Sequence, residues 1–157
     1  MPRITPNLWF DTESKEAAEF YVSVFPNSEI RHILYYPEGS MRPAGTVLTV
    51  DFVLDGQDFT AIDGGPQFTF NEAISLSIAC ADQAEVDYYW TKLTDGGEEG
   101  PCGWLKDKFG LSWQIVPTAL PELLSNPDKE KAQRVMAAML EMKKIEIDEL
   151  ERAAAAA

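Results

Sequence analysis

Side chains of the kinds that catalyse reactions are few in this chain of 157 residues, and their spacing matches no common catalytic motif. The chain has one histidine, His32, and two cysteines, Cys80 and Cys102, that are not spaced as CxxC. A Ser–His–acid triad needs a histidine beside an activated nucleophile, and the sequence has neither a GxSxG turn nor a glycine-rich phosphate loop. The sequence therefore assigns no catalytic residue.

Four residues could still take part in chemistry, and each has a simpler structural explanation. Cys102 lies in a predicted glycine turn, where nearby lysines and glutamates have opposite effects on a thiolate. Asp51 and Asp63, on neighbouring predicted strands, would suit an acid–base pair, although solvated strand positions explain them more simply. His32 lies on a predicted strand beside Arg31, where a structural or solvated histidine is favoured over a metal ligand.

Hydrophobic alternation and turn residues predict two successive β-α-β-β-β modules, an internal repeat of architecture. The first has a helix over 11–25 and strands over 3–10, 29–36, 46–54 and 57–63. The second has a helix over 81–93 and strands over 72–80, 98–101, 104–107 and 111–116. We expect one compact domain overall, built from modules at 1–70 and 71–120 and a helical appendix at 121–157.

Polar and apolar side chains occupy opposite faces of three of these predicted strands, 3–10, 72–80 and 111–116. The apolar faces consist of Leu8 and Phe10, Ile74 and Leu76, and Trp113 and Ile115. Because an apolar face must meet the helices, the opposite side chains should point toward an open cleft. These are Asn7, Ser75 and Gln114.

The charge of the chain limits its partners. It carries 26 acidic against 13 basic residues, a net charge of −13, so nucleic acids and anionic membranes are poor partners. Solubility is a simpler explanation of this charge than an acidic functional patch. No apolar run approaches the roughly 18–20 residues of a membrane span. Without a signal peptide or a disulfide framework, a cytoplasmic location is expected.

Three stretches resemble one family of proteins in particular. They are ITPNLWFDTESKEAAEFYVSVFPNS, FNEAISLSIACADQAEVDYYWTKLTDGGEEGPCGWLKDKFGLSWQIVP and VMAAMLEMKKIEIDELERA. The doubled module resembles the vicinal oxygen chelate superfamily, which includes glyoxalase I, bleomycin-resistance proteins and extradiol dioxygenases. The stretches resemble its PhnB-like branch, often labelled 3-demethylubiquinone-9 3-methyltransferase.

The resemblance implies an α+β fold, the glyoxalase/bleomycin resistance fold. Two βαβββ modules would form an eight-stranded curved mixed sheet, with the ligand cleft on its concave side and a C-terminal helix added. It also implies a homodimer. An apolar stripe on the C-terminal helix would pack either on a second chain or on the chain's own domain. The stripe consists of Val135, Met136, Met139, Leu140 and Met142.

In enzymes of this superfamily the metal ligands come from the first, fourth, fifth and eighth strands. In this sequence those strands offer Asn7, Asp63, Ser75 or Ser77, and Gln114, the last in place of a metal-binding Glu. Transition metals prefer imidazole, thiolate and carboxylate ligands, so no metal and no tightly bound cofactor is expected. The alternative is a weakly held divalent cation, because amide oxygens do bind hard cations.

We therefore expect a pocket for a small planar or amphipathic molecule. Its predicted residues are Asn7, Trp9, Phe59, Asp63, Ser75, Ser77, Trp104 and Gln114. The favoured function is a small-molecule binding protein of the glyoxalase/bleomycin resistance type. One alternative is a metal-dependent lyase or dioxygenase. A methyltransferase, which the family label suggests, is less favoured, because the sequence lacks a glycine-rich turn between a parallel strand and a helix.

Overall fold

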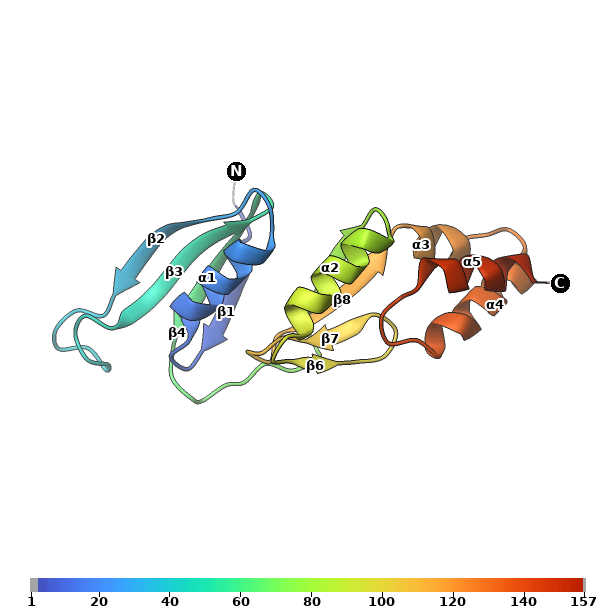
Figure 1. Cartoon of the computed structure of the whole chain (residues 1–157). Coiled ribbons are helices and arrows are strands. Elements are labelled where there is room, and N and C mark those ends of the chain that lie inside the picture. The colour runs from blue at the N-terminus through green and yellow to red at the C-terminus, as the bar shows by residue number, and fades with distance from the viewer. Residues whose placement is uncertain (1–2, 157) are drawn as a thin grey trace. The chain divides into compact units, whose positions relative to one another are not determined.

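The computed structural model describes residues 3–156 and contains both predicted modules (Figure 1). The elements follow the expected order β-α-β-β-β twice, and helices form the appendix. The predicted α+β fold is confirmed, with its eight strands hydrogen-bonded as two four-stranded sheets. The chain divides into two compact units between Phe70 and Asn71, and each unit is described by itself.

Unit 1 consists of one helix packed on one face of a mixed sheet (Figure 1). Its elements are β1 (Asn7–Phe10), α1 (Ser14–Val24), β2 (Glu29–Tyr35), β3 (Val47–Leu54) and β4 (Gln57–Asp63). The strand order is β1-β4-β3-β2, in which β1 is parallel to β4 and the other pairs are antiparallel. The predicted Asp55-Gly56 hairpin turn joins β3 to β4, and both residues have positive φ, 46° and 82°.

Aromatic stacking forms the centre of the core of unit 1. Tyr21 of α1 is fully buried and stacks on Phe52 of β3, with ring centroids 6.3 Å apart. Phe52 in turn stacks on Phe59 of β4 at 5.5 Å. Leu8 and Phe10 of β1 are also buried, as their alternation predicted.

Unit 2 repeats this arrangement with shorter strands. Its module consists of β5 (Ser75–Cys80), α2 (Gln83–Thr94), β6 (Glu98–Glu99), β7 (Trp104–Lys106) and β8 (Ser112–Pro117), in the sheet order β5-β8-β7-β6. Asp82 caps α2 as predicted, because its carboxylate accepts the amide N–H of Glu85 at 2.9 Å. Buried side chains of α2 pack on the face of the sheet that carries Leu105 and Ile115.

The turn before β8 is held by one buried carboxylate, that of Asp107. Its Oδ1 accepts the amide N–H groups of Phe109 and Leu111 at 2.9 and 3.1 Å, and its Oδ2 accepts Trp113 Nε1–H at 2.9 Å. Trp113 is thereby fixed on the helix side of β8. Its neighbour Gln114 consequently points to the opposite face of the sheet.

The appendix contains three helices, α3 (Ala119–Leu124), α4 (Lys129–Leu140) and α5 (Ile147–Ala155), and belongs to unit 2. Its own core consists of Leu120, Val135, Met142, Ile145 and Leu150. The predicted apolar stripe is therefore split: Val135 and Met142 pack within unit 2, whereas Met136 and Leu140 are exposed. No helix within residues 3–156 is long and apolar enough to cross a membrane.

Candidate functional site

We call the face of each sheet that lies opposite its packed helix the open face. In unit 1 the open face carries Asn7 and Trp9, as their alternation predicted. Asn7 pairs with Thr60, is exposed, and donates to the Thr5 carbonyl at 2.9 Å. Trp9 is half-buried, and its indole N–H donates to the Gly65 carbonyl at 2.9 Å. Contact of either residue with a ligand stays a prediction.

Asp63 and Phe59 lie on the helix side of β4, so the prediction that they face a cleft with Asn7 is corrected. Asp63 pairs with buried Phe10, is 5% exposed, and its Oδ1 accepts the Ser14 amide N–H at 2.8 Å. Phe59 is buried in the aromatic stack of the core. The physical reason is the first turn of α1, whose unpaired amide groups need an acceptor and favour a negative charge.

Burial dominates the electrostatics of this carboxylate. The pKa of Asp63 is raised above its ordinary value by desolvation, which outweighs the opposing hydrogen bond from the Ser14 amide and the charge of Arg42. The backbone carbonyl of the same residue accepts the Tyr36 hydroxyl at 2.6 Å. Asp63 is thus a structural residue that joins the end of β4 to α1.

His32 and Asp51 border a separate pocket of unit 1, with a volume of about 340 Å³, to which Phe59 also contributes. Asp51 accepts the Thr60 hydroxyl at 2.7 Å, so its carboxylate is engaged within the sheet. Asp51 and Asp63 therefore point to opposite faces and do not form the acid–base pair considered from the sequence.

The open face of unit 2 brings four of the predicted site residues together. Gln114 of β8 pairs with Ser77 of β5 on one side and with Trp104 of β7 on the other. Its side-chain amide donates to the Ser75 hydroxyl at 2.9 Å. Ser75, Trp104 and Gln114 are half-buried and Ser77 is exposed, so all four are accessible from this face.

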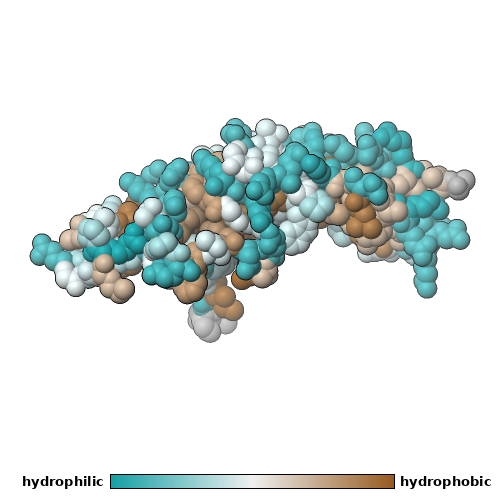
Figure 2. Space-filling model, turned by 90° about the horizontal axis from the view of Figure 1, so that it is seen from below, coloured by the Kyte–Doolittle hydropathy of each residue, from teal (hydrophilic) through white to brown (hydrophobic). Residues whose placement is uncertain are grey.

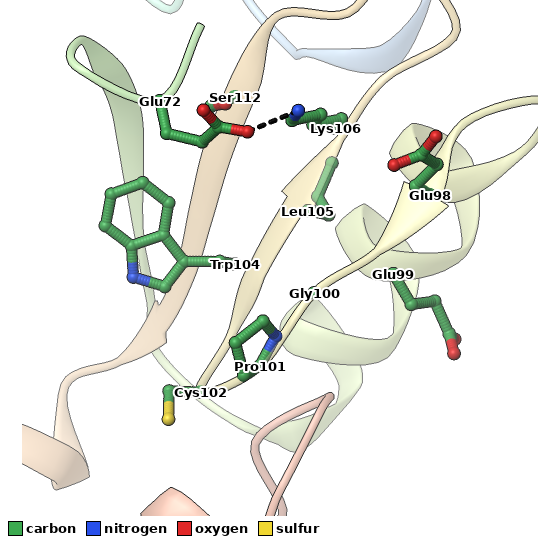
Figure 3. Close-up of a pocket in the computed structure, with 10 residues that line it drawn as sticks. All are labelled: Glu72, Glu98, Glu99, Gly100, Pro101, Cys102, Trp104, Leu105, Lys106 and Ser112. Atoms are coloured by element: carbon green, nitrogen blue, oxygen red, sulfur yellow. Dashed lines mark ion pairs between the residues drawn. The ribbon is translucent and has the colours of Figure 1, made fainter.

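A pocket of about 380 Å³ lies beside this group and includes Trp104 (Figure 3). Its other lining residues are Glu72, Glu98, Glu99, Gly100, Pro101, Cys102, Leu105, Lys106 and Ser112. None of these nine was predicted as a site residue. For Lys106 and Ser112 a signal was available, since each stands two residues from a predicted one on the same strand and therefore shares its face.

Charges in the pocket are concentrated around Lys106. Its ammonium forms an ion pair with Glu72, drawn as a dashed line in Figure 3, which raises the pKa of Lys106 and lowers that of Glu72. Glu98 pairs across the strands with Lys106 and adds a second carboxylate on the same face. Glu99 points to the helix side, where it accepts Trp90 Nε1–H at 2.9 Å.

Ser112 is the one lining residue whose hydroxyl is buried without a hydrogen-bond partner in the described part of the chain. It is 1% exposed and pairs with Ser75 and Lys106, which places it on the open face. Buried hydroxyl groups are nearly always hydrogen-bonded, so this group stands out.

The four strand positions that hold metal in related enzymes do not fit a transition metal in this chain. Asn7, Ser75 and Gln114 are neutral and weakly donating, and the single carboxylate, Asp63, is held by the Ser14 amide on the helix side. Neither unit, over residues 3–156, gathers three His, Cys, Asp or Glu side chains in a group that could hold a metal ion.

The two βαβββ modules and their open faces define a class of protein, the glyoxalase/bleomycin resistance fold of the vicinal oxygen chelate superfamily. Within that class, residues 2–116 match the family model described as 3-demethylubiquinone-9 3-methyltransferase, and the chain belongs to this PhnB-like family.

Solved structures agree with this assignment. A PhnB protein from Bacillus cereus is 36% identical, covers 74% of this chain and 100% of its own, and superposes with a TM-score of 0.67. Two others share the fold at lower identity. Protein PA1353 from Pseudomonas aeruginosa is 20% identical with a TM-score of 0.61, covering 74% of this chain and 98% of its own. The fosfomycin resistance protein FosX from Listeria monocytogenes is 18% identical with a TM-score of 0.55, covering 80% and 98%. Among curated proteins nothing matches.

Proposed function

We propose that this chain binds a small organic molecule on the open face of unit 2, without a tightly bound transition metal. The observation that carries the proposal is the hydrogen bond of 2.9 Å from Gln114 to Ser75, beside the half-buried indole of Trp104. An amide, hydroxyl groups and an aromatic ring suit hydrogen bonding and stacking to an organic ligand.

The size of the adjoining pocket supports the same proposal. Its volume of about 380 Å³ falls within the range of roughly 300–1,000 Å³ that small-molecule sites occupy. Trp104 belongs both to the pocket and to the group around Gln114, so one ligand could contact both.

An NMR screen of the full chain against a chemically diverse fragment library tests this proposal. Fragments that bind should shift the Trp104 indole resonance and the side-chain amide resonances of Gln114, and these shifts should be lost in Trp104→Phe and weakened in Gln114→Ala. Binders that act only at other surfaces would overturn the proposal.

A metal-dependent lyase or dioxygenase is the second candidate in the superfamily, and the donor set does not favour it. Such a site would have to rely on Asp63, Gln114 and water, and the Asp63 carboxylate is already engaged with Ser14. Metal analysis of protein purified without chelator should find zinc, nickel and iron far below one per chain. One equivalent of any of them would favour this alternative.

The family description names methyl transfer, but this chain lacks the glycine-rich turn that such a function would use. Dinucleotide and S-adenosylmethionine sites of the doubly wound kind use a glycine-rich turn from a parallel strand into a helix. Here β1 connects to α1 through Asp11-Thr12-Glu13, and β5 connects to α2 through Ala81-Asp82, both without glycine. Calorimetric titration with S-adenosylmethionine should show no binding, and clear binding would revive this function.

We also propose that the protein is a cytoplasmic homodimer. Exposed apolar side chains on α4, Met136 and Leu140, support an interface there, and Figure 2 shows hydrophobic residues at the surface over the C-terminal helices. Light scattering should return twice the chain mass of 17.5 kDa, and a value equal to one chain would contradict the dimer.

A further inference from the structure

The charged residues in the pocket of unit 2 favour a ligand of positive charge. Lys106 is the only cationic residue among the described residues that line it, against three glutamates. Two of these share the open face with Lys106. Glu72 is its ion-pair partner, and Glu98 is its neighbour across the paired strands. Lys106 is therefore already neutralised, and the excess charge of the face is negative.

Ser112 lies beside this ion pair (Figure 3). Its hydroxyl is buried and has no partner, although a hydroxyl can donate one hydrogen bond and accept two. Burying a hydroxyl without a partner is unfavourable. A polar ligand group that reaches this hydroxyl would therefore form a hydrogen bond without breaking one within the protein. This is an observation independent of the glutamates, and it points to a polar ligand atom at the same place.

Trp104 supplies an apolar wall next to these polar groups. Its indole is half-buried, and it lines the same pocket as Glu72 (Figure 3). An aromatic face close to carboxylates is the usual setting for an organic cation, because the ring and the carboxylates both attract positive charge.

Building on the ligand-binding function proposed above, we propose that this pocket takes a small arylalkyl amine, a primary ammonium joined to an aromatic ring by a short alkyl chain. The ring of the ligand packs against Trp104. Its ammonium takes the place of the Lys106 ammonium at Glu72 and donates a hydrogen bond to Ser112 Oγ, while Lys106 remains beside Glu98. Lys106 thus acts as an internal stand-in for the ligand, and one ammonium replaces another without a net change of charge at Glu72.

An anionic ligand fits the same residues poorly. It would have to displace Glu72 from Lys106 and would then lie close to Glu98, in a chain whose net charge is −13. Repulsion between like charges disfavours that exchange.

Three probes with the same ring and the same two-carbon spacer separate these cases: phenethylamine, 2-phenylethanol and 3-phenylpropionate. Each is titrated into the full chain while the Trp104 indole N–H is followed by NMR, with Trp104→Phe to assign it. We expect phenethylamine to bind most tightly, with a Kd roughly tenfold below that of the alcohol, because it alone forms a charged hydrogen bond to Glu72. The carboxylate should bind most weakly.

Variants of the two ion-pair partners give opposite expected results. Glu72→Gln should remove the roughly tenfold preference for the amine. Lys106→Met should tighten phenethylamine binding, because the competing ammonium is gone. Glu151→Gln on α5 and Lys92→Met on α2 change the net charge equally outside the pocket and should leave the preference unchanged.

Several results would overturn the inference. If 2-phenylethanol or 3-phenylpropionate binds best at Trp104, the arylalkyl-amine assignment is wrong while the ligand-binding function stands. Loss of phenethylamine binding in a folded Lys106→Met variant would equally contradict it. If none of the three probes moves the Trp104 resonance at millimolar concentration, the amine assignment fails; whether the open face binds ligands at all is then decided by the fragment screen.

Discussion

The carboxylate of Asp63 accepts the amide N–H of Ser14 at 2.8 Å and so joins the end of β4 to the first turn of α1. This contact removes the only carboxylate of the four metal-ligand positions from the open side of its sheet. The groups that remain at the other three positions, Asn7, Ser75 and Gln114, are neutral. The role of Asp63 as a helix cap can be tested directly.

Replacing Asp63 should destabilise the fold, and by less where the new side chain still has an oxygen that accepts the Ser14 amide N–H. Asp63→Ala leaves the Ser14 amide without its partner and should lower the free energy of unfolding by about 1–2 kcal/mol. Asp63→Asn keeps a carbonyl oxygen in the same place and should cost less. Urea unfolding of both variants at neutral pH measures the difference, and equal losses would show that the capping hydrogen bond contributes nothing.

The stability of the wild-type protein and that of Asp63→Asn should depend differently on pH. Burial raises the pKa of Asp63 in the folded state above its ordinary value of 3.8, so folding favours the protonated form. Protonation of Asp63 therefore adds to the free energy of unfolding. This contribution is fully present below pH 3.8 and is lost as the pH rises through the higher folded-state pKa. The wild-type protein should therefore lose stability relative to Asp63→Asn from about pH 4 upward. A relative gain of the wild type over that range would contradict the assignment.

The two cysteines should differ sharply in reactivity. Burial, with smaller contributions from Glu85 and Asp82, raises the pKa of the Cys80 thiol to about 11, and the side chain is fully buried. Cys102 is half-buried at the pocket. Because the thiolate is the reactive form, a disulfide reagent at pH 8 should modify one thiol per folded chain and two after denaturation. Cys102→Ser should abolish the native reaction, and Cys80→Ala should leave it unchanged.

Introducing a carboxylate on β8 should not create a metal site. In Gln114→Glu the other donors, Asn7 and Ser75, remain neutral, and Asp63 remains on the helix side. Protein purified without chelator should contain zinc, nickel and iron at far below one equivalent, as in the wild type. A full equivalent in this variant alone would mean that the remaining positions are better ligands than their chemistry indicates.

Gln83 should prove to be the tether that holds the appendix on α2. Its side-chain amide donates to the Ile145 carbonyl at 3.0 Å and accepts the Ile147 amide N–H at 2.8 Å. Gln83→Ala should lower the free energy of unfolding by about 1–2 kcal/mol and speed hydrogen exchange at Ile147. Gln133→Ala, at an exposed position of α4, is the matched control. Unchanged exchange at Ile147 would contradict the tether.

The pocket should respond to this tether as well. Cys102 and Gly103 donate their amide N–H groups to the carbonyls of Met142 and Lys143, at 2.8 and 2.7 Å. The segment that follows α4 therefore shapes the turn at the edge of the pocket, and a loosened appendix would loosen that turn.

The sequence predicts the orientation of a strand where one face is polar and the other apolar. On β5 and β8 serine and glutamine alternate with apolar residues, and the faces of Ser75 and Gln114 were predicted correctly. On β4 both faces mix polar and apolar side chains, so alternation could not show that Asp63 faces the helix. Asp63 faces the helix because its carboxylate accepts an amide N–H at the start of α1, from a residue 49 positions away in the sequence.

Contacts over such distances also explain why the pocket itself was missed. Glu72 precedes β5 and Lys106 ends β7, and only the folded unit brings them together. For Ser112 the alternation with Gln114 indicated its face, but a serine at the start of a strand carries no signal that its hydroxyl is buried without a partner.

We propose that the open face of unit 2 binds an organic ligand through neutral and aromatic groups. A crystal structure of the protein soaked with its tightest fragment tests it most directly, with anomalous data collected above the zinc edge. We expect fragment density against Trp104 within reach of Gln114 or Ser112, and no strong anomalous peak at the four strand positions. Fragment density only elsewhere, or a fully occupied metal at those positions, would contradict it.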